Sequence, residues 1–214
     1  MLKNKRILIT AGPTWVPIDK VRVISNIATG QTGILLAKKL KNLGARVTLV
    51  LGPVEPCCLD KNIKLIRFKF FNELRDIIVR KLKSKKYDIV IHSAAVSDYM
   101  PARYYGRKIK SGMRNFKLNL IPTIRIIDLI KEVDPSLCLV GFKFEPQAAK
   151  NILIKEAKRL MRQAGLDLAV ANSIEGTRYL AYILEGAKIY GPMLNKKDLV
   201  EQLVDVIKEK ICKI

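Results

Sequence analysis

Histidine is almost absent from this sequence, and cysteine is scarce. The 214 residues contain one histidine and four cysteines, with no Cys-x-x-Cys pair, which excludes a zinc site built from these ligands. One histidine also argues against a Ser-His-Asp hydrolase, and we expect His92, at the end of an apolar run, to be structural. Cys57 and Cys58 are adjacent and poorly placed for a mutual disulfide. With Cys138 and Cys212, they are interpreted as reduced thiols of a cytoplasmic protein.

Long hydrophobic runs are missing as well. No apolar stretch approaches the roughly 18 residues that a membrane-spanning helix needs, and residues 7–9 lead directly into Gly12-Pro13, too soon for a secretory signal. We therefore expect no membrane partner. Hydrophobic residues make up 49%, and no linker or repeat interrupts the chain, so a single globular domain is predicted over residues 1–214.

Acidic residues are few relative to basic ones. The sequence has 19 acidic and 40 basic residues, a net charge of +21, and the excess is spread over both halves of the chain. Such a charge attracts nucleic acids, anionic membranes or phosphorylated substrates, unless it is only a lysine-rich surface. Aromatic residues make up 7% and do not alternate with the basic stretches, which argues against binding of single-stranded nucleic acid. A basic nucleic-acid-binding α/β module remains an alternative.

Short apolar runs alternate with amphipathic stretches along the chain. Short runs bounded by glycine and proline favour buried strands, and apolar residues at i, i+3 and i+4 favour helices. We expect strands over 6–10, 46–51, 63–68, 88–92, 137–142 and 168–171, a hairpin over 179–190, and helices over 30–43, 71–83, 124–133, 148–164 and 196–211. This alternation predicts an α/β fold, with a Rossmann-like, doubly wound, mostly parallel sheet and a small antiparallel extension. Ligands of such sheets bind beyond the carboxyl ends of the strands.

The segment after the first strand begins with Gly12 and is expected to be a long polar loop over residues 12–29. Gly30 and Gly33 follow at a helix start, where small residues either expose backbone N–H groups to an anion or allow tight packing on the sheet. The dinucleotide-binding fingerprint needs glycines in an immediate strand-to-helix turn, which disfavours the alternative of an NAD(P) oxidoreductase. Asn26 is either a loop or cap residue or a neutral donor to a developing oxyanion.

The segment after the fourth strand contains a second group of candidates. Ala94 and Ala95 would let a ligand approach the backbone closely. Asp98 would suit Mg²⁺, which prefers carboxylate and phosphate oxygens, or would cap a turn. Lys108 and Lys110 are expected on one face of a short strand, either as site cations or as a solvated basic edge.

Together these motifs resemble the phosphopantothenoylcysteine synthetase family. The similar blocks are Ile9-Thr-Ala-Gly-Pro-Thr14, Ile18-Asp19, Val21-Arg-Val-Ile-Ser-Asn26, Thr29-Gly-Gln-Thr-Gly33, His92-Ser-Ala-Ala-Val-Ser-Asp-Tyr-Met-Pro101, Lys108-Ile-Lys110, Pro122-Thr-Ile-Arg-Ile-Ile127, Leu139-Val-Gly-Phe-Lys143 and Asp167-Leu-Ala-Val-Ala-Asn172. They occur in the family order and cover nearly the whole chain. The sequence resembles the stand-alone form, without a decarboxylase domain ahead of it.

The resemblance implies an amide ligase of coenzyme A biosynthesis. Such an enzyme joins 4′-phosphopantothenate to L-cysteine and uses a nucleoside triphosphate, usually CTP in bacteria, with Mg²⁺. The carboxylate would attack the α-phosphate to give an acyl nucleotidylate, and the cysteine amine would then displace the nucleoside monophosphate. Family members are usually homodimers, so residues 100–120 are expected to pair subunits and cover the site, or else to form a plain surface hairpin.

The resemblance also implies roles for individual residues. Lys108 would serve the nucleotidyl transfer, Asn26 the amide-forming step, and Asp98 the metal. Nucleotide contacts are expected at Gly12, Ala94, Ala95, Asp98, Lys108, Lys110, Thr123, Ile124, Arg125, Ile126 and Phe142, and substrate contacts at Arg22, Asn26, Gly30 and Gly33. The family pattern is broken at Pro13, Ser111, Thr123–Ile126, Leu160 and Ala164, which leaves the choice between CTP and ATP open.

Overall fold

The computed structural model describes residues 2–56, 59–84 and 86–211, which form one large sheet with helices on both faces. The sheet has the strand order β12-β11-β10-β9-β6-β1-β4-β5. Its strands are β1 (Arg6–Ala11), β4 (Arg46–Leu51), β5 (Lys64–Arg67), β6 (Ile89–His92), β9 (Cys138–Phe144), β10 (Leu168–Glu175), β11 (Arg178–Glu185) and β12 (Lys188–Met193). The helices are α1 (Gln31–Asn42), α2 (Phe71–Ser84), α3 (Ile126–Val133), α4 (Lys150–Ala164) and α5 (Lys196–Ile211).

The sheet is mostly parallel and reverses direction of winding at its centre. Strands β5, β4, β1, β6, β9 and β10 pair in parallel, and β11 and β12 add an antiparallel edge. Along the chain the winding starts at β1, proceeds outward through β4 and β5, and then returns to β6 on the other side of β1. In doubly wound sheets, ligands bind at the carboxyl ends of the two strands flanking this reversal. The predicted fold class is confirmed.

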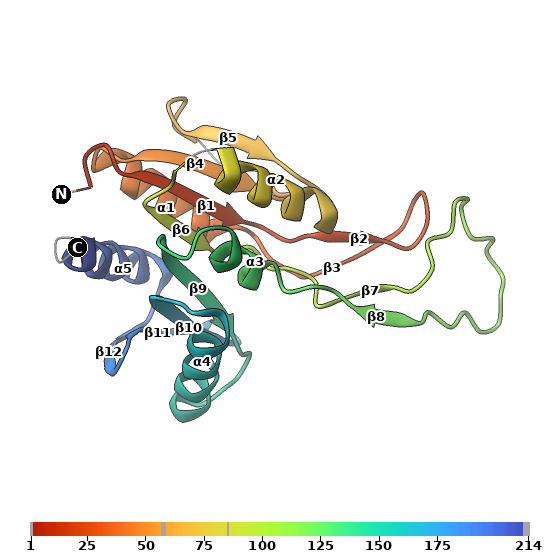
Figure 1. Cartoon of the computed structure of the whole chain (residues 1–214). Coiled ribbons are helices and arrows are strands. Elements are labelled where there is room, and N and C mark those ends of the chain that lie inside the picture. Colours follow the sequence, from red (N-terminus) through yellow and green to blue (C-terminus); the bar gives the residue numbers. More distant parts are fainter. Residues whose placement is uncertain (1, 57–58, 85, 212–214) are drawn as a thin grey trace.

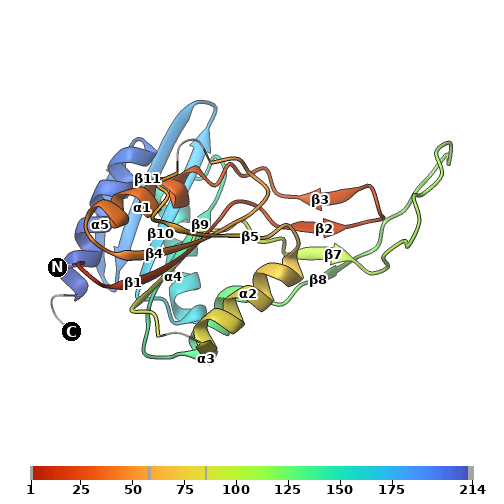
Figure 2. The same cartoon turned by 90° about the horizontal axis from the view of Figure 1, so that it is seen from above.

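The two faces of the sheet are covered by different helices. Helices α1 and α5 lie on one face, and α2, α3 and α4 lie on the other (Figures 1 and 2). Strand β1 shows why the sequence requires both layers: Ile7 and Ile9 enter one core, and Leu8 enters the other, with all three fully buried. A strand with two covered faces has an apolar run instead of an alternating pattern.

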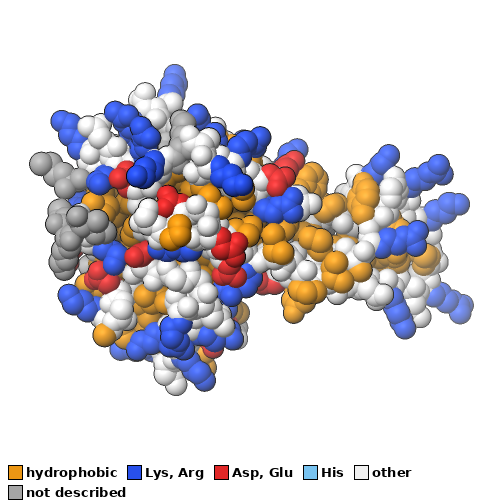
Figure 3. All heavy atoms as spheres, in the orientation of Figure 1, with side chains coloured by type: hydrophobic (Ala, Val, Ile, Leu, Met, Phe, Trp, Pro, Cys, Tyr) orange, Lys and Arg blue, Asp and Glu red, His pale blue; other side chains and the backbone are white. Residues whose placement is uncertain are grey.

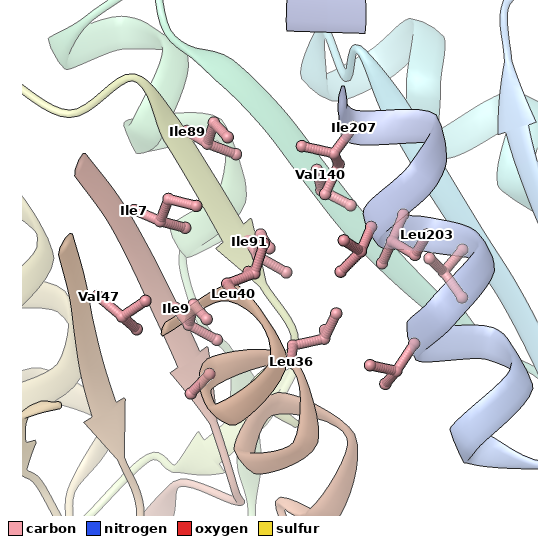
Figure 4. Close-up of a cluster of buried hydrophobic side chains, with 14 of the residues drawn as sticks. Ile7, Ile9, Leu36, Leu40, Val47, Ile89, Ile91, Val140, Leu203 and Ile207 are labelled. Atoms are coloured by element: carbon pink, nitrogen blue, oxygen red, sulfur yellow. The ribbon is translucent and has the colours of Figure 1, made fainter. Parts of the chain in front are cut away.

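The core under α1 and α5 is built from branched aliphatic side chains. Figure 4 shows Leu36 and Leu40 of α1 and Leu203 and Ile207 of α5 facing strand residues such as Ile91. Each of these five side chains has no exposed surface. Burial of a side chain of this size contributes roughly 1.5–3 kcal/mol, so this layer is a major source of stability.

Two short antiparallel pairs extend beyond the carboxyl end of the sheet (Figures 1 and 2). Strand β2 (Trp15–Pro17) pairs with β3 (Val23–Ser25), and we call residues 15–25 the hairpin. Strand β7 (Tyr99–Pro101) pairs with β8 (Leu120–Pro122), and we call residues 99–122 the arm.

These two extensions correct the sequence predictions. The expectation of a long polar loop over 12–29 is wrong in its middle part, because the hairpin strands over 15–17 and 23–25 lie within it. The expected short strand around Lys108–Lys110 is also wrong: residues 102–119 contain no strand, and β8 begins only at Leu120. Apart from one isolated bridge between Asp19 and Tyr105, residues 102–119 pair with no other strand.

Most other boundaries agree with the sequence predictions to within two residues. The strand expected over 168–171 is longer and runs to Glu175, because β11 pairs with residues 169–175. Within the described part of the chain, no helix has both the length and the apolar character needed to cross a membrane.

Candidate functional site at the reversal of the sheet

The loops after β1 and β6 are hydrogen-bonded to each other at the reversal point. The Ala95 N–H donates to the Gly12 carbonyl at 3.0 Å, and the Thr14 N–H donates to the Ala95 carbonyl at 3.1 Å. The Ser97 N–H donates to Thr14 Oγ1 at 2.9 Å, and the Ala94 N–H donates to Thr10 Oγ1 at 3.3 Å. The structure therefore brings Gly12, Ala94 and Ala95 together where a ligand is expected.

Asn26 joins this pair of loops through its side chain. Its Nδ2 donates to the Ala95 carbonyl at 3.2 Å and to the Val96 carbonyl at 3.0 Å, and the residue is exposed. A primary amide has two N–H hydrogens, so both are used by the loop in this structure. Asn26 thus holds the 94–96 backbone in place, and donation to a substrate oxygen requires one of these contacts to be exchanged.

Gly30 and Gly33 bring the start of α1 back to the same point. Gly30 has a left-handed backbone, with φ of 67°, and a Cβ built on it would lie 3.2 Å from the Gly12 backbone nitrogen. The chain therefore leaves the sheet at Gly12, forms the hairpin, and returns at Gly30 to a position beside Gly12. A Cβ on Gly33 would lie 2.5 Å from Ala11 Cβ and 2.8 Å from Ser93 Oγ. Close packing of α1 on the sheet is sufficient to require glycine at position 33.

The segment before α3 is tied to the loop after β6. The Thr123 N–H donates to the Asp98 carbonyl at 2.9 Å, and Thr123 Oγ1 donates to the Ser97 carbonyl at 2.7 Å. The Asp98 side chain and Ile124 are exposed. We call Gly12, Asn26, Ala94, Ala95, Asp98 and Thr123 the sheet-edge cluster.

The other expected nucleotide contacts lie outside this cluster: Ile124 follows Thr123, Lys108 and Lys110 lie on the arm, and three more lie in or beside the core. Arg125 Nη1 is 3.5 Å from Asp128 Oδ2 at the start of α3. Ile126 is 1% exposed and packs in the core, so its side chain has no surface for a ligand. Phe142 lies in β9, half-buried against the core under α1 and α5.

The hairpin and the arm form a second group of candidate residues. Arg22 Nη1 donates to Asp19 Oδ2 at 2.8 Å, and both Nη1 and Nη2 donate to the Ile109 carbonyl at 3.3 Å. Lys108 and Lys110 flank Ile109 and are exposed. We call Asp19, Arg22, Lys108 and Lys110 the arm cluster. Figure 3 shows basic side chains gathered at the outer end of this extension and hydrophobic ones along it.

Asp19 is the functional candidate that sequence reasoning missed. Its carboxylate has no exposed surface, and the Ile109 N–H, the largest influence, lowers its pKa to about 2, assisted by the Val21 and Arg22 amides and the Arg22 guanidinium. The only sequence signal was its place in the Ile18-Asp19 block. Nothing in the local pattern pointed to a partner 90 positions later.

His92 lies beside the site at the carboxyl end of β6, whereas Cys138 lies at the opposite, amino end of the sheet, beside Ile89. His92 Nδ1 lies 2.9 Å from Thr10 Oγ1, and burial lowers the pKa of its imidazole to about 4, so it is neutral near pH 7. The structural interpretation of His92 is confirmed. Cys138 is a buried free thiol whose pKa is raised by burial to about 12. Cys57, Cys58 and Cys212 lie outside the described residues.

A divalent cation would have few protein ligands here. Among the described residues, no group of three or more His, Cys, Asp or Glu side chains is placed to hold a metal. Asp98 offers one exposed carboxylate beside the sheet-edge backbone. This donor set fits Mg²⁺, which in phosphate-transfer sites takes one or two carboxylates and completes its shell with water and substrate phosphates.

The two clusters supply complementary chemistry. The sheet-edge cluster offers small side chains, ordered backbone and one carboxylate, and the arm cluster offers cations. The arm extends away from the sheet within this chain (Figures 1 and 2). The arm therefore carries its cations away from the sheet-edge cluster of the same chain.

Comparison with protein families gives one match over almost the whole chain. Residues 2–211 match the DNA/pantothenate metabolism flavoprotein C-terminal domain. The coenzyme A biosynthesis bifunctional protein CoaBC of Thermococcus kodakarensis is 36% identical over 215 residues, which cover 98% of this chain and 52% of that protein. The CoaBC protein of Bacillus subtilis is 32% identical, covering 96% and 52%. The chain thus spans about half the length of these curated relatives.

Solved structures have the same fold. A DNA/pantothenate metabolism flavoprotein from Streptococcus pneumoniae superposes with a TM-score of 0.86 at 26% identity, covering 96% of this chain and 99% of that one. A mutant of Cab2 in complex with phosphopantothenate-cysteine superposes with a TM-score of 0.78 at 17% identity, covering 99% and 89%. The second likeness concerns the fold alone.

Proposed function

Because this chain belongs to the family of DNA/pantothenate metabolism flavoprotein C-terminal domains, we propose that it joins 4′-phosphopantothenate to L-cysteine in coenzyme A biosynthesis. The observation that carries the proposal is the sheet-edge cluster. The motif blocks around Gly12, Asn26 and Ala94–Asp98, separate in the sequence, meet at the reversal of the sheet through direct hydrogen bonds. We propose that this activity is cytoplasmic, because a free thiol such as Cys138 is typical of proteins in a reducing compartment.

The first step is nucleotidyl transfer. A carboxylate oxygen of phosphopantothenate attacks the α-phosphorus of the nucleotide, the new P–O bond forms, and the bond to pyrophosphate breaks. Two anions must approach each other, so cations lower the barrier. Lys108, Lys110 and Arg22 supply positive charge from the arm cluster. In this proposal the backbone at Gly12, Ala94 and Ala95 lines the nucleotide, and Phe142 and the backbone of residues 123–126 provide the remaining contacts.

The second step forms the amide. The cysteine amine attacks the acyl carbon, the tetrahedral oxyanion collapses, and the nucleoside monophosphate leaves while the nitrogen loses a proton. Asn26 first orders the 94–96 backbone that this intermediate contacts, and its amide donates to the oxyanion when a loop carbonyl is exchanged for it. Gly30 and Gly33 keep α1 close to this point, so that bulky side chains do not fill the substrate site.

Mg²⁺ and the identity of the base complete the proposal. Mg²⁺ bound at Asp98 and the nucleotide phosphates would offset the charge of the triphosphate. CTP is the proposed nucleotide. ATP is kept as the alternative, because Thr123, Ile124 and Arg125 differ from the family segment that contacts the base.

We also propose that the arm pairs two copies of the chain. Tyr104, Met113, Phe116, Leu120 and Ile121 on the arm are each more than 40% exposed. Tyr105 and Phe116 form an edge-to-face pair at 5.8 Å, which gives the arm its own small apolar surface. Exposed apolar area of this kind marks association sites, and a homodimer would bury it.

A nucleotide panel tests the reaction. Purified protein with Mg²⁺ is incubated with CTP, ATP, GTP or UTP, with and without 4′-phosphopantothenate, and pyrophosphate is measured before and after L-cysteine is added. We expect pyrophosphate only when phosphopantothenate is present, most with CTP, and amide product only with cysteine. Absence of pyrophosphate with all four nucleotides would refute the proposal.

A matched pair of arm variants tests the role of Lys108. We expect Lys108→Gln to slow pyrophosphate release by roughly 10²-fold or more, as loss of a charge-stabilising group does in comparable sites. Lys117→Gln, which removes an exposed lysine from the same arm, serves as the control and should be close to wild type. Equal effects of the two substitutions would assign only a general electrostatic role to Lys108.

A further inference from the structure

We propose that Asp19 is a positioning residue that clamps the Ile109 peptide and so fixes the segment that carries Lys108 and Lys110. The inference rests on the proposed function and adds a residue to it. It has three supports: the contacts of the carboxylate, its burial, and the lack of other structure around Ile109.

The two carboxylate oxygens of Asp19 divide their contacts between the hairpin and the arm. Oδ1 accepts the Val21 N–H at 2.8 Å and the Arg22 N–H at 2.7 Å, which closes the hairpin turn locally. Oδ2 accepts the Ile109 N–H at 3.0 Å and Arg22 Nη1 at 2.8 Å. A carboxylate has about four acceptor positions, so Asp19 has no capacity left for a substrate or a metal.

The clamp grips both sides of Ile109. Its N–H donates to Asp19, and its carbonyl accepts from Arg22 Nη1 and Nη2, whose guanidinium is itself held by Asp19. These contacts use three of the five guanidinium hydrogens, so two remain for a phosphate. Lys108 and Lys110 are the immediate neighbours of Ile109 in the sequence. The clamp therefore fixes the backbone position from which both lysine side chains extend.

Burial makes the clamp strong. The Asp19 side chain has no exposed surface, whereas the Arg22 side chain is 42% exposed. Hydrogen bonds to a buried charged group are stronger than neutral ones, and a buried carboxylate without donors is costly. The lowered pKa of Asp19 agrees with a permanently ionised acceptor.

The surrounding chain offers little alternative support. Residues 102–119 contain no strand, and strand pairing in the arm stops at Pro101 and Leu120. The Tyr105 N–H donates to the Ile18 carbonyl at 2.9 Å, which fixes the near part of the segment to the same hairpin. Loss of the Asp19 clamp should therefore release Ile109 without unfolding the sheet.

Asp19→Asn is the sharpest variant. If the amide oxygen keeps the Val21 and Arg22 contacts, the new NH₂ group faces the Ile109 N–H and Arg22, so donors oppose donors across the clamp. Asp134→Asn is the matched control, because Asp134 closes another local turn by accepting the Ser136 N–H at 3.1 Å, and an amide oxygen can do the same. Both variants remove one negative charge.

The first readout is hydrogen exchange at Ile109 and does not depend on activity. We expect Asp19→Asn to speed exchange in a peptide containing residues 107–111 by roughly ten- to a hundredfold, the loss expected for hydrogen bonds to a charged group. Exchange in β1 and β6 should be unchanged, as should the arm in Asp134→Asn. Unchanged exchange at Ile109 in Asp19→Asn would overturn the proposal.

The second readout is a kinetic split. Asp19→Asn should lower kcat for pyrophosphate release by roughly tenfold or more, with a smaller change in the KM for nucleotide, because the sheet-edge cluster is intact. Ile109→Pro removes the N–H that Asp19 receives from the arm and adds a ring constraint, and it should reproduce this loss. Lys117→Pro adds the same constraint at an exposed residue of the arm and should not. If wild-type protein is inactive, the proposed function fails while the exchange result stands. If exchange rises but kcat does not fall, Asp19 is only structural and the positioning role is overturned.

Discussion

At the scale of single residues, Asn26 has an expected role as an oxyanion donor and an observed role in holding the 94–96 loop, and a substitution can distinguish the two. Its amide donates to the Ala95 and Val96 carbonyls. Asn26→Asp replaces both donors with acceptors, so a carboxylate would face two carbonyl oxygens. We expect the 94–96 loop to loosen and the KM for nucleotide to rise by roughly tenfold or more, as loss of one or two such hydrogen bonds implies. Steady-state kinetics of pyrophosphate release at varied nucleotide concentration measures this change.

The same variant distinguishes two functions of the amide. If Asn26 acted only as an oxyanion donor, the first step would keep its nucleotide dependence, and the acyl nucleotidylate would accumulate in mass spectra. Asn26→Gln provides the control, because it keeps the amide and moves it by one methylene. An unchanged KM for nucleotide in Asn26→Asp would contradict the loop-holding role.

Residue roles could be predicted from sequence where the signal is local. His92 ends an apolar strand, and its structural role followed from that position alone. The clusters at Gly12, Ala94 and Asp98 could be placed at one edge because the carboxyl ends of parallel strands meet there. Asp19 could not be assigned, since its function is defined by Ile109, and no periodicity links residues so far apart.

At the scale of elements, the same distinction separates the sheet from the arm. Strands with both faces buried, such as β1 and β4, read as short apolar runs and were predicted almost to the residue. The hairpin strands have three residues each and mixed exposure, so no alternation marks them. The strand prediction for Lys108–Lys110 in the arm was wrong because a sequence pattern shows which residues favour extended backbone, but not whether a partner strand is present.

Helix α5 offers a direct test of the core layer. Leu203 is fully buried between α5 and the sheet, as Figure 4 shows. We expect Leu203→Ala to lower the free energy of unfolding by roughly 2–5 kcal/mol, the range for cavity-forming substitutions in a core. Leu194→Ala, at a residue that is 66% exposed, should change it by less than about 0.5 kcal/mol. Chemical denaturation measures both; equal losses would contradict the packing described for α5.

At the scale of the whole molecule, the sheet with its helices and the extension formed by the hairpin and the arm have different roles. The sheet and its helices form a closed core on both faces, and this part gives the fold its stability. The hairpin and arm have many exposed apolar and basic side chains and add little to that core. The proposed reaction needs both parts, because ordered backbone from one and cations from the other must converge on a single nucleotide.

The pH dependence of stability follows from the buried histidine. Burial lowers the pKa of His92 from 6.5 to about 4 in the folded protein. The unfolded chain therefore binds a proton between these values and the folded chain does not, so stability present above pH 6.5 is lost as the pH falls toward 4. The slope approaches about 1.4 kcal/mol per pH unit. Urea unfolding at a series of pH values measures it.

His92→Asn should remove this slope, because its amide stays within reach of Thr10 and does not titrate. Asp19 does not contribute to the decline between pH 6.5 and 4. Its pKa is lowered from 3.8 to about 2, so the stability that its ionised carboxylate provides is lost only as the pH falls below 3.8. A variant that keeps the full decline between pH 6.5 and 4 would show that another group is responsible. A decline that disappears in His92→Asn would assign the acid sensitivity of the whole fold to one imidazole beside β1.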